Sequence, residues 1–151
     1  MDVKSLLNHK ATRLITVTPE TKITDAVSLM MQNRIGSLPV VEDGALVSII
    51  TERDVMFALN SHAENIQTIS VREIMAGDLV TCTAECPIQD AMTLMFDNKL
   101  GRRIRHLPIT EDGKLVGIVS NGDLLDAMLD ETEFENRIMK NYIKNWPEES
   151  A

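Results

Sequence analysis

Hydrophobic positions recur at helical spacing in two stretches of the chain, residues 23–31 and 88–95. Each stretch is followed by two short apolar runs around Glu-Asp-Gly, in LPVVEDGALVSII and LPITEDGKLVGIV. Such a pair of runs around a tight turn is typical of a β-hairpin. The pattern therefore predicts a helix followed by a hairpin, written twice.

The two stretches belong to an internal repeat. TVTPETKITDAVSLMMQN (residues 16–33) matches TCTAECPIQDAMTLMFDN (81–98) at an offset of 65, and LPVVEDGALVSIITERD matches LPITEDGKLVGIVSNGD at an offset of 69. The second copy has gained four residues within KLGRRIR. A further apolar run, RLITV or LVTCT, predicts a strand before each long helix, and another helix follows each final Asp. Each unit is predicted to be β-α-β-β-α.

One unit of about 50 residues is too small to bury a good core alone. The two copies are therefore expected to pack sheet to sheet with pseudo-two-fold symmetry, in an α/β fold (α+β in some schemes). Residues 1–66 are assigned to the first repeat with an N-terminal helix, 67–130 to the second repeat, and 131–151 to a C-terminal amphipathic helix and tail.

The C-terminal segment carries an apolar stripe that departs from the repeat. Two interpretations stay open: the stripe packs back on the chain's own core, or it forms a dimer contact. The dimer contact is slightly favoured because most of the scarce aromatic residues lie here. The stripe consists of Phe134, Ile138, Tyr142 and Trp146, four residues apart, with Met139 and Ile143 beside them.

Composition narrows the function classes. The 151 residues are 44% hydrophobic and 25% charged, as in an ordinary globular protein. The formal charge of −8 argues against general nucleic-acid binding, which needs a basic face. No apolar run approaches the roughly 18 residues of a membrane span, and MDVKSLLNHK lacks the features of a signal peptide. No membrane insertion and a cytoplasmic location are therefore expected.

Catalytic and metal chemistry find little support in the sequence. Cys82 and Cys86 are the only cysteines, and without a nearby His they predict neither a metal site nor a disulfide. No Ser/His/Asp set or Walker-type loop is present, and His9, His62 and His106 are scattered. The chain is therefore not expected to be an enzyme.

The repeated ending Thr/Ser-x-x-Asp carries the candidate chemistry. In TERD and SNGD, the residues Thr51 and Asp54, or Ser120 and Asp123, fit a capping box that any helix could carry for stability. Two equivalent occurrences also favour binding. A helix N-terminus suits a phosphate, and a carboxylate there suits the cis-diol of a ribose. Basic residues in the same units that could hold phosphates are Arg53 in the first copy and the cluster Arg102, Arg103, Arg105 and His106 in the second.

These residues lead to a family resemblance. GSLPVVEDGALVSIITERD and RHLPITEDGKLVGIVSNGD resemble the CBS domain, named for cystathionine β-synthase; two in tandem form a CBS pair, or Bateman module. The resemblance runs from about Leu6 to Asp130 and is closest to free-standing prokaryotic CBS proteins. It implies two clefts between the repeats that bind AMP, ADP, ATP, NAD(H) or S-adenosylmethionine as a regulatory ligand, with no catalytic cofactor.

The resemblance also implies roles for particular residues. The ribose would be bound by Thr51, Asp54, Ser120 and Asp123, and phosphates by Arg53, Arg105 and His106. Adenine pockets would be formed by Ile15, Thr16, Ile35 and Gly36 facing Asp123, and by Val80, Thr81 and Ile104 facing Asp54. Both basic sets then gather around the Asp54 cleft, so that cleft is expected to prefer a charged ligand.

The resulting hypothesis is a non-catalytic sensor module that binds an adenosine-containing small molecule and modulates a partner such as an enzyme or transporter. A homodimer is expected from the resemblance. The alternative is a structural or protein-interaction CBS pair with empty clefts, which often loses the full Thr/Ser-x-x-Asp motif.

Overall fold

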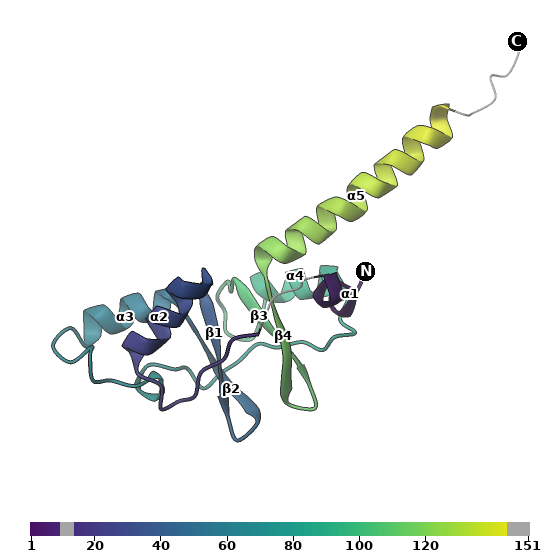
Figure 1. Ribbon diagram of the computed structural model, residues 1–151. Coiled ribbons are helices and arrows are strands. Elements are labelled where there is room, and N and C mark those ends of the chain that lie inside the picture. Colours follow the sequence, from purple (N-terminus) through teal and green to yellow (C-terminus); the bar gives the residue numbers. More distant parts are fainter. Residues whose placement is uncertain (10–13, 145–151) are drawn as a thin grey trace, which may run out of the picture.

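The computed structural model describes residues 1–9 and 14–144, except the side chain of Phe134, and shows two similar units side by side (Figure 1). The first unit contains α2 (Ile23–Asn33), β1 (Ser37–Glu42), β2 (Ala45–Thr51) and α3 (Glu52–Ser61). The second unit contains α4 (Ile88–Phe96), β3 (His106–Glu111), β4 (Lys114–Ser120) and α5 (Asn121–Lys144). A short helix, α1 (Val3–His9), precedes the first unit in the chain, and a 3₁₀ turn, η1 (Val71–Glu73), precedes the second.

The two predicted hairpins are confirmed. Strand β1 pairs antiparallel with β2, and β3 with β4. Both turns use Asp-Gly in the left-handed region, with φ of 52° and 80° at Asp43 and Gly44 and of 52° and 77° at Asp112 and Gly113. Such turns match the twist of the flanking strands, which explains why Asp-Gly recurs at this place.

The strand predicted before each long helix is reduced to one parallel bridge. The Val17 N–H donates to the Pro39 carbonyl at 3.0 Å, and the Val17 carbonyl accepts from the Val41 N–H at 2.8 Å. Cys82 bridges β3 in the same way. The chain then turns, with the Thr21 N–H bonded to the Thr18 carbonyl at 3.1 Å, so pairing cannot continue. Arg13, at the start of the predicted RLITV strand, lies outside the described residues.

The segment that precedes each unit in the chain packs on the other unit. The Val71 N–H, just before the second unit, donates to the Thr21 carbonyl of the first at 2.8 Å. The Val3 N–H, before the first unit, donates to the Cys86 carbonyl of the second at 2.9 Å. Thr21 and Cys86 are equivalent under the offset of 65 that relates the two copies. The exchange therefore obeys the internal symmetry and links the units in both directions.

Each unit has its own hydrophobic core, and the exchanged segments complete both. Val3 is fully buried in the core of the second unit, and Val71 is fully buried in that of the first. The N-terminal helix assigned to the first repeat by sequence order thus packs with the second repeat. The buried members of the first core are Val17, Ile23, Ala26, Met30, Leu38, Val40, Ile50, Ala58, Ile69 and Val71. Those of the second are Val3, Val80, Ile88, Ala91, Met95, Leu107, Ile109, Val119, Leu124 and Ala127.

One pair of equivalent positions fits its exchanged segment differently in the two units. Buried Ser48 in β2 donates its hydroxyl hydrogen bond to the Ala76 carbonyl at 2.7 Å. The equivalent residue in β4 is Gly117, where an added Cβ would lie 2.7 Å from a methyl carbon of Leu7. The missing side chain leaves room for α1 to approach β4. At this position the first unit has a Ser that bonds to the segment after η1, and the second unit has a Gly that makes room for α1.

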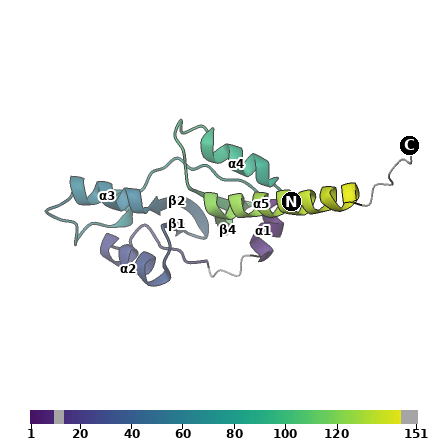
Figure 2. The same cartoon turned by 90° about the horizontal axis from the view of Figure 1, so that it is seen from above.

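The two hairpins face one another at the centre of the molecule. Strand β2 lies against β4, and the Leu46 N–H approaches the Gly113 carbonyl at 3.4 Å. Seen from above, α2 and α3 lie at one end of the pair, and α1, α4 and α5 at the other (Figure 2). The predicted mixed fold of two packed repeats is confirmed.

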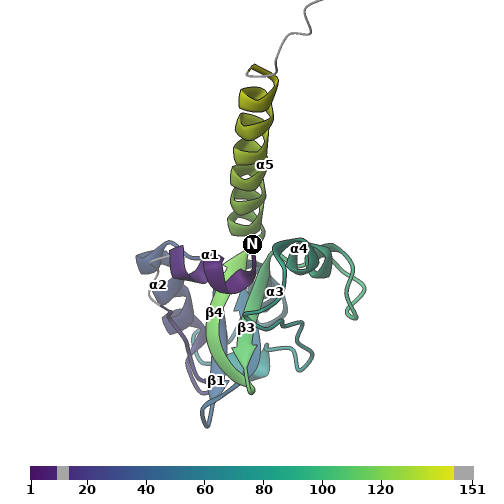
Figure 3. The ribbon, with the colours of Figure 1, turned by 90° about the vertical axis from the view of Figure 1, so that its right-hand side faces the viewer.

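Helix α5 runs without a break across the predicted boundary at residue 130. Its first turns pack on the second unit through buried Leu124 and Ala127, with α1 and α4 on either side of its base (Figure 3). The rest projects from the body, and Ile138 and Tyr142 are 52% and 61% exposed. The interpretation that the stripe packs back on the core is therefore wrong for the described residues; Trp146 lies outside them. Within residues 1–9 and 14–144, no helix is apolar enough over a sufficient length to cross a bilayer.

Val3→Ala and Val71→Ala test the exchange as a matched pair. Each removes two buried methyl groups, so each is expected to lower the free energy of unfolding by roughly 2 kcal/mol. Hydrogen–deuterium exchange should rise first in α4 for Val3→Ala and first in α2 for Val71→Ala, because each valine fills the core of the unit it does not precede. Lys4→Ala, exposed in the same segment, serves as the control. If deuterium exchange rose first in α2 for Val3→Ala and first in α4 for Val71→Ala, the exchange of segments would be contradicted.

Candidate ligand-binding clefts

In the first unit, the Thr51–Asp54 motif lies where β2 passes into α3. Thr51 is extended, with φ −124°, and Asp54 is the third residue of the helix. The Thr51 N–H donates to Asp54 Oδ2 at 2.8 Å, and the Thr51 hydroxyl lies 3.2 Å from the same oxygen. The motif therefore forms a capping box that fixes the carboxylate at the helix N-terminus.

The second unit repeats this geometry between β4 and α5. The Ser120 N–H donates to Asp123 Oδ2 at 2.8 Å, and the Asp123 N–H donates to Ser120 Oγ at 3.0 Å. All four side chains of the two motifs are half-buried. The capping interpretation of Thr/Ser-x-x-Asp is thus confirmed in both copies, and any ligand must bind to carboxylates that already serve the fold.

The residues just before β1 and β3 lie beside these helix starts. The Glu52 N–H, the first of α3, donates to the Gly36 carbonyl at 3.1 Å. The Asn121 N–H, the first of α5, donates to the Arg105 carbonyl at 2.9 Å. By backbone contact, Gly36 is therefore beside the helix of Asp54, although the resemblance assigned it to the pocket facing Asp123. The assignment of whole pockets to one or the other Asp stays a prediction.

One contact crosses between the units at this point. A Cβ added to Gly36 would lie 2.7 Å from Glu52 Oε1 and 3.7 Å from His106 Cε1. His106 is the first residue of β3 in the second unit, whereas Gly36 and Glu52 belong to the first. The imidazole of one repeat therefore lies beside the residue that precedes β1 in the other.

Two hollows of similar size lie beside the two helix starts. The one near α3 has a volume of about 340 Å³ and the one near Asp123 about 330 Å³. The first contains Ile35 and Gly36 from the predicted adenine pockets and has Arg34 and Glu52 as its charged residues. The second has three carboxylates, from Asp123, Asp126 and Asp130, together with Met1, Leu6, His9 and Ala127. The hollow at Asp123 is thus the more acidic of the two.

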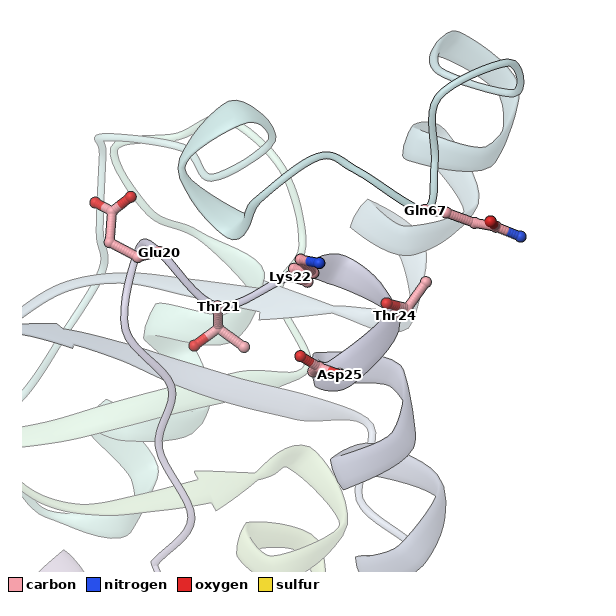
Figure 4. A pocket seen from close by; sticks show the side chains of 6 residues that line it. All are labelled: Glu20, Thr21, Lys22, Thr24, Asp25 and Gln67. Carbon is pink, nitrogen blue, oxygen red and sulfur yellow. The ribbon is translucent and has the colours of Figure 1, made fainter.

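A larger open hollow of about 670 Å³ lies elsewhere, at the start of α2 (Figure 4). Its lining is polar and contains none of the residues that the sequence suggests for ligand binding. It is formed by Glu20, Thr21, Lys22, Thr24, Asp25 and Gln67.

The remaining predicted residues differ in how available they are to a ligand. Arg53, Arg105, Thr16 and Thr81 are exposed, and Ile15 and Ile104 are half-buried. Val80 is buried in the second core, which limits it to a wall of a cleft.

The basic loop before β3 is partly engaged with the protein itself. The guanidinium of Arg103 lies over the ring of Phe96, 5.4 Å from its centroid, in cation–π geometry. Arg102 and Arg105 are exposed.

Sequence reasoning predicted an N-terminal helix but missed that α1 lies beside Asp123, and it missed Glu52 as a neighbour of the first motif. The repeat offset pairs Glu52 with Asn121, so a charge difference beside the two motifs was visible in the sequence. Nothing in the sequence indicated that Leu6 and His9 of α1 would lie beside Asp123, because that proximity results from the exchange of segments.

The two cysteines are free thiols held in their neutral form. Burial raises the pKa of the Cys82 thiol to about 12, and the neighbouring Cys86 adds to the shift. Burial also raises the pKa of Cys86. Among the described residues, no group of three or more His, Cys, Asp or Glu side chains is placed to hold a metal ion.

Comparison with known proteins agrees with this architecture. The family model of the CBS domain matches residues 3–61 and 71–130. The CBS domain-containing protein YhcV of Bacillus subtilis is 37% identical over 122 residues, 81% of this chain and 84% of YhcV. The crystal structure of the CBS-domain containing protein ATU1752 from Agrobacterium tumefaciens superposes with a TM-score of 0.76 at 32% identity, covering 85% of this chain and 99% of that one.

A third relative was solved with ligands. The CBS domain pair of protein MJ0100, in complex with 5'-methylthioadenosine and S-adenosyl-L-methionine, has a TM-score of 0.72 and 27% identity. The superposition covers 87% of this chain and 98% of that chain.

The chain belongs to the CBS-domain family, as a tandem CBS pair, and a CBS pair is a regulatory module. Its relatives YhcV and ATU1752 are matched over most of their own length.

Asp54→Ala and Asp123→Ala are each expected to lower the free energy of unfolding by about 1 kcal/mol without any ligand, because each removes the carboxylate that accepts the N-cap N–H in the capping box. Urea denaturation measures this, with Asp126→Ala on the exposed side of α5 as the control. Unchanged stability in both variants would show that the capping bonds contribute nothing.

Thiol labelling tests the state of the cysteines. With a pKa of about 12, only about one Cys82 thiol in ten thousand is ionised at pH 8. A disulfide reagent such as DTNB should therefore label the native protein far more slowly than the protein in guanidinium, where two thiols react at the rate of free cysteine. Rapid labelling of the native protein at pH 8 would contradict the raised pKa values.

Proposed function

We propose that this chain is a non-catalytic sensor that binds an adenosine-containing nucleotide between its CBS repeats and modulates a partner protein, such as an enzyme or transporter. The ligand candidates are AMP, ADP, ATP, NAD(H) and S-adenosylmethionine, and the ligands of MJ0100 add methylthioadenosine. The observation that carries the proposal is the complete Thr/Ser-x-x-Asp motif at both helix N-termini, held in one geometry in the two units.

The cap geometry is compatible with ribose binding at Asp54. Both hydrogen bonds from Thr51 fall on Oδ2, so Oδ1 remains for a ribose hydroxyl. The positive end of the α3 dipole favours a nearby phosphate.

We propose that the Asp54 side binds the charged part of the ligand. Arg53 is exposed next to Asp54, and the His106 imidazole reaches the same helix start from the second unit. Glu52 opposes them, because its carboxylate lies at Gly36 and repels a phosphate placed there. On the other side Gly122 replaces Arg53, and Asp126 and Asp130 add negative charge beside Asp123. That side suits an uncharged adenosine moiety better.

A second candidate is a CBS pair that binds another protein and no nucleotide. The observation in its favour is that capping alone accounts for the Thr/Ser-x-x-Asp residues. In this case the clefts are architecture, and the exposed helices act as the binding surface. The two candidates make opposite predictions for ligand-induced stabilisation.

Thermal unfolding of nucleotide-free protein against the ligand panel tests the proposal. A ligand at 100 times its Kd stabilises by roughly 2.7 kcal/mol, which should raise the melting temperature by roughly 5–10 °C for a chain of this length. The ligand-induced shift, rather than the absolute melting temperature, is compared among variants because Asp54→Ala also removes a cap. We expect Asp54→Ala to abolish the shift and Asp123→Ala to reduce it less.

Arg53→Ala separates phosphate binding from capping, because this exposed side chain takes no part in the box. We expect it to reduce the shift caused by ATP while that caused by methylthioadenosine, which lacks phosphate, is unchanged. Arg137→Ala, on the projecting part of α5, is the control for loss of one positive charge. Isothermal titration gives the corresponding Kd values. No shift with any ligand in protein shown to be nucleotide-free would favour the second candidate.

We also propose that the chain functions as a homodimer. The large exposed apolar side chains on the helices support this, and α5 suggests the surface that is used.

A further inference from the structure

The second half of α5 stays exposed instead of packing on the body of the protein within the described part of the chain. The helix of 24 residues is about 36 Å long, and every side chain described from Thr132 to Lys144 is exposed. Short helices in water are marginal unless an apolar face is packed against something. A helix that leaves the body in this way, carrying apolar side chains, indicates a partner.

Four of the six large apolar side chains exposed on α5 fall at heptad positions, and two polar residues, Thr132 and Asn136, occupy the positions between them. Starting at Leu125, the spacings are 4, 3, 4, 3 and 4, which is the alternation of positions a and d in a coiled coil. The seam begins on the body, where Leu125 and Leu129 are 53% and 52% exposed, and continues to Met139 and Ile143 at 60% and 68%. Its members are Leu125, Leu129, Thr132, Asn136, Met139 and Ile143.

We propose that α5 pairs with α5 of a second copy of this chain, as a parallel, in-register, two-stranded coiled coil along this seam. The inference specifies the surface of the homodimer proposed above and does not depend on a nucleotide. Leu129, Asn136 and Ile143 occupy position a, and Leu125, Thr132 and Met139 occupy position d.

Of the two polar residues in the seam, Thr132 at position d and Asn136 at position a, Asn136 favours two strands in one register. Asn136 is exposed at position a, halfway along the seam. A single Asn at position a can pair with the same residue of a parallel partner, and it fixes register and dimeric state at a cost in stability. The buried Asn pair lowers the stability of the coil, but it disfavours coils with a shifted register or with more than two strands.

The flanking charges are complementary in the same arrangement. In a parallel coil, position g of one helix faces position e of the next heptad on the other helix, five residues later. Here position g holds Glu135 and that position e holds Lys140, both exposed. Symmetry makes two such attractive pairs. Residues five apart do not meet on one helix, so this complementarity has no use within a single α5.

The other apolar side chains of the projecting part lie beside the seam or away from it. Tyr142 falls at position g and can cover the edge of the seam, whereas Ile138 falls at position c, outside it. Ile138 therefore provides a control, because it is 52% exposed and on the same part of the helix.

The first experiment measures the mass of the full chain by light scattering after size exclusion, across protein concentrations. We expect a dimer of twice the 16.9 kDa chain mass. Met139→Asp and Ile143→Asp should each shift the protein to monomer, because two carboxylates would face each other in the seam, and Ile138→Asp should stay dimeric. A monomer at all concentrations would overturn both the coil and the homodimer, leaving the nucleotide test unaffected. A dimer that is disrupted by Ile138→Asp, or by none of the three, would overturn the coil.

The second experiment tests orientation by charge exchange. Glu135→Lys should weaken the dimer roughly tenfold, since two attractive pairs become repulsive. Lys140→Glu should have a similar effect. The double variant Glu135→Lys/Lys140→Glu should recover the original Kd to within about twofold, because the pairs are restored with reversed signs. Additive weakening in the double variant would overturn the parallel register.

Discussion

The exchange of segments between the two units is the constraint on which the rest of the structure depends. Val3 and Val71 are fully buried, each in the core of the unit that it does not precede. A unit of this size leaves much of its apolar surface exposed, and the exchanged valine with its neighbours covers one side. Neither unit is complete without residues that belong by sequence to the other. The central contact of β2 with β4 is therefore made between two bodies that are already tied at two points.

That constraint bears on the clefts, because the elements around them come from both halves of the chain. The His106 imidazole reaches Gly36 across the central contact, and α1 lies beside Asp123 only because it has been exchanged. A change in the relative position of the units would alter both surroundings together. The proposed ligand would favour one arrangement only to the extent that it binds that arrangement more tightly.

Features that depend on residues close together in the sequence could be predicted, whereas contacts between residues far apart in the sequence could not. The hairpins and caps are local, so Glu-Asp-Gly and Thr/Ser-x-x-Asp predicted them correctly in both copies. The strand before each long helix was predicted too long, because an apolar run does not reveal a turn that ends its pairing after one bridge. The exchange was invisible, since Val3 and Val71 show the same local pattern whichever unit they cover.

The sequence showed an apolar pattern at the C-terminus, but the surface that this pattern predicts depends on the residue at which the helix is taken to begin. Taken from residue 131, the segment shows residues at spacing four, among them Ile138 and Tyr142, which suit packing on a nearby core. Taken from Asn121, where α5 starts, the same helix shows a heptad seam that begins at Leu125 on the folded body. The boundary placed at residue 130 hid that continuity.

Continuity also connects the two proposals in space. Asp123 caps the first turn of α5, and the same unbroken helix carries the seam from Leu125 to Ile143. A helix transmits a change in its starting direction along its whole length, so a small rotation at the cap becomes a larger displacement near Lys144. Two copies joined along α5 would hold their Asp123 clefts close to the base of the coil. If the ligand changes the direction of α5 at that cleft, ligand binding and association of the helices are coupled, and each alters the affinity of the other by the same factor.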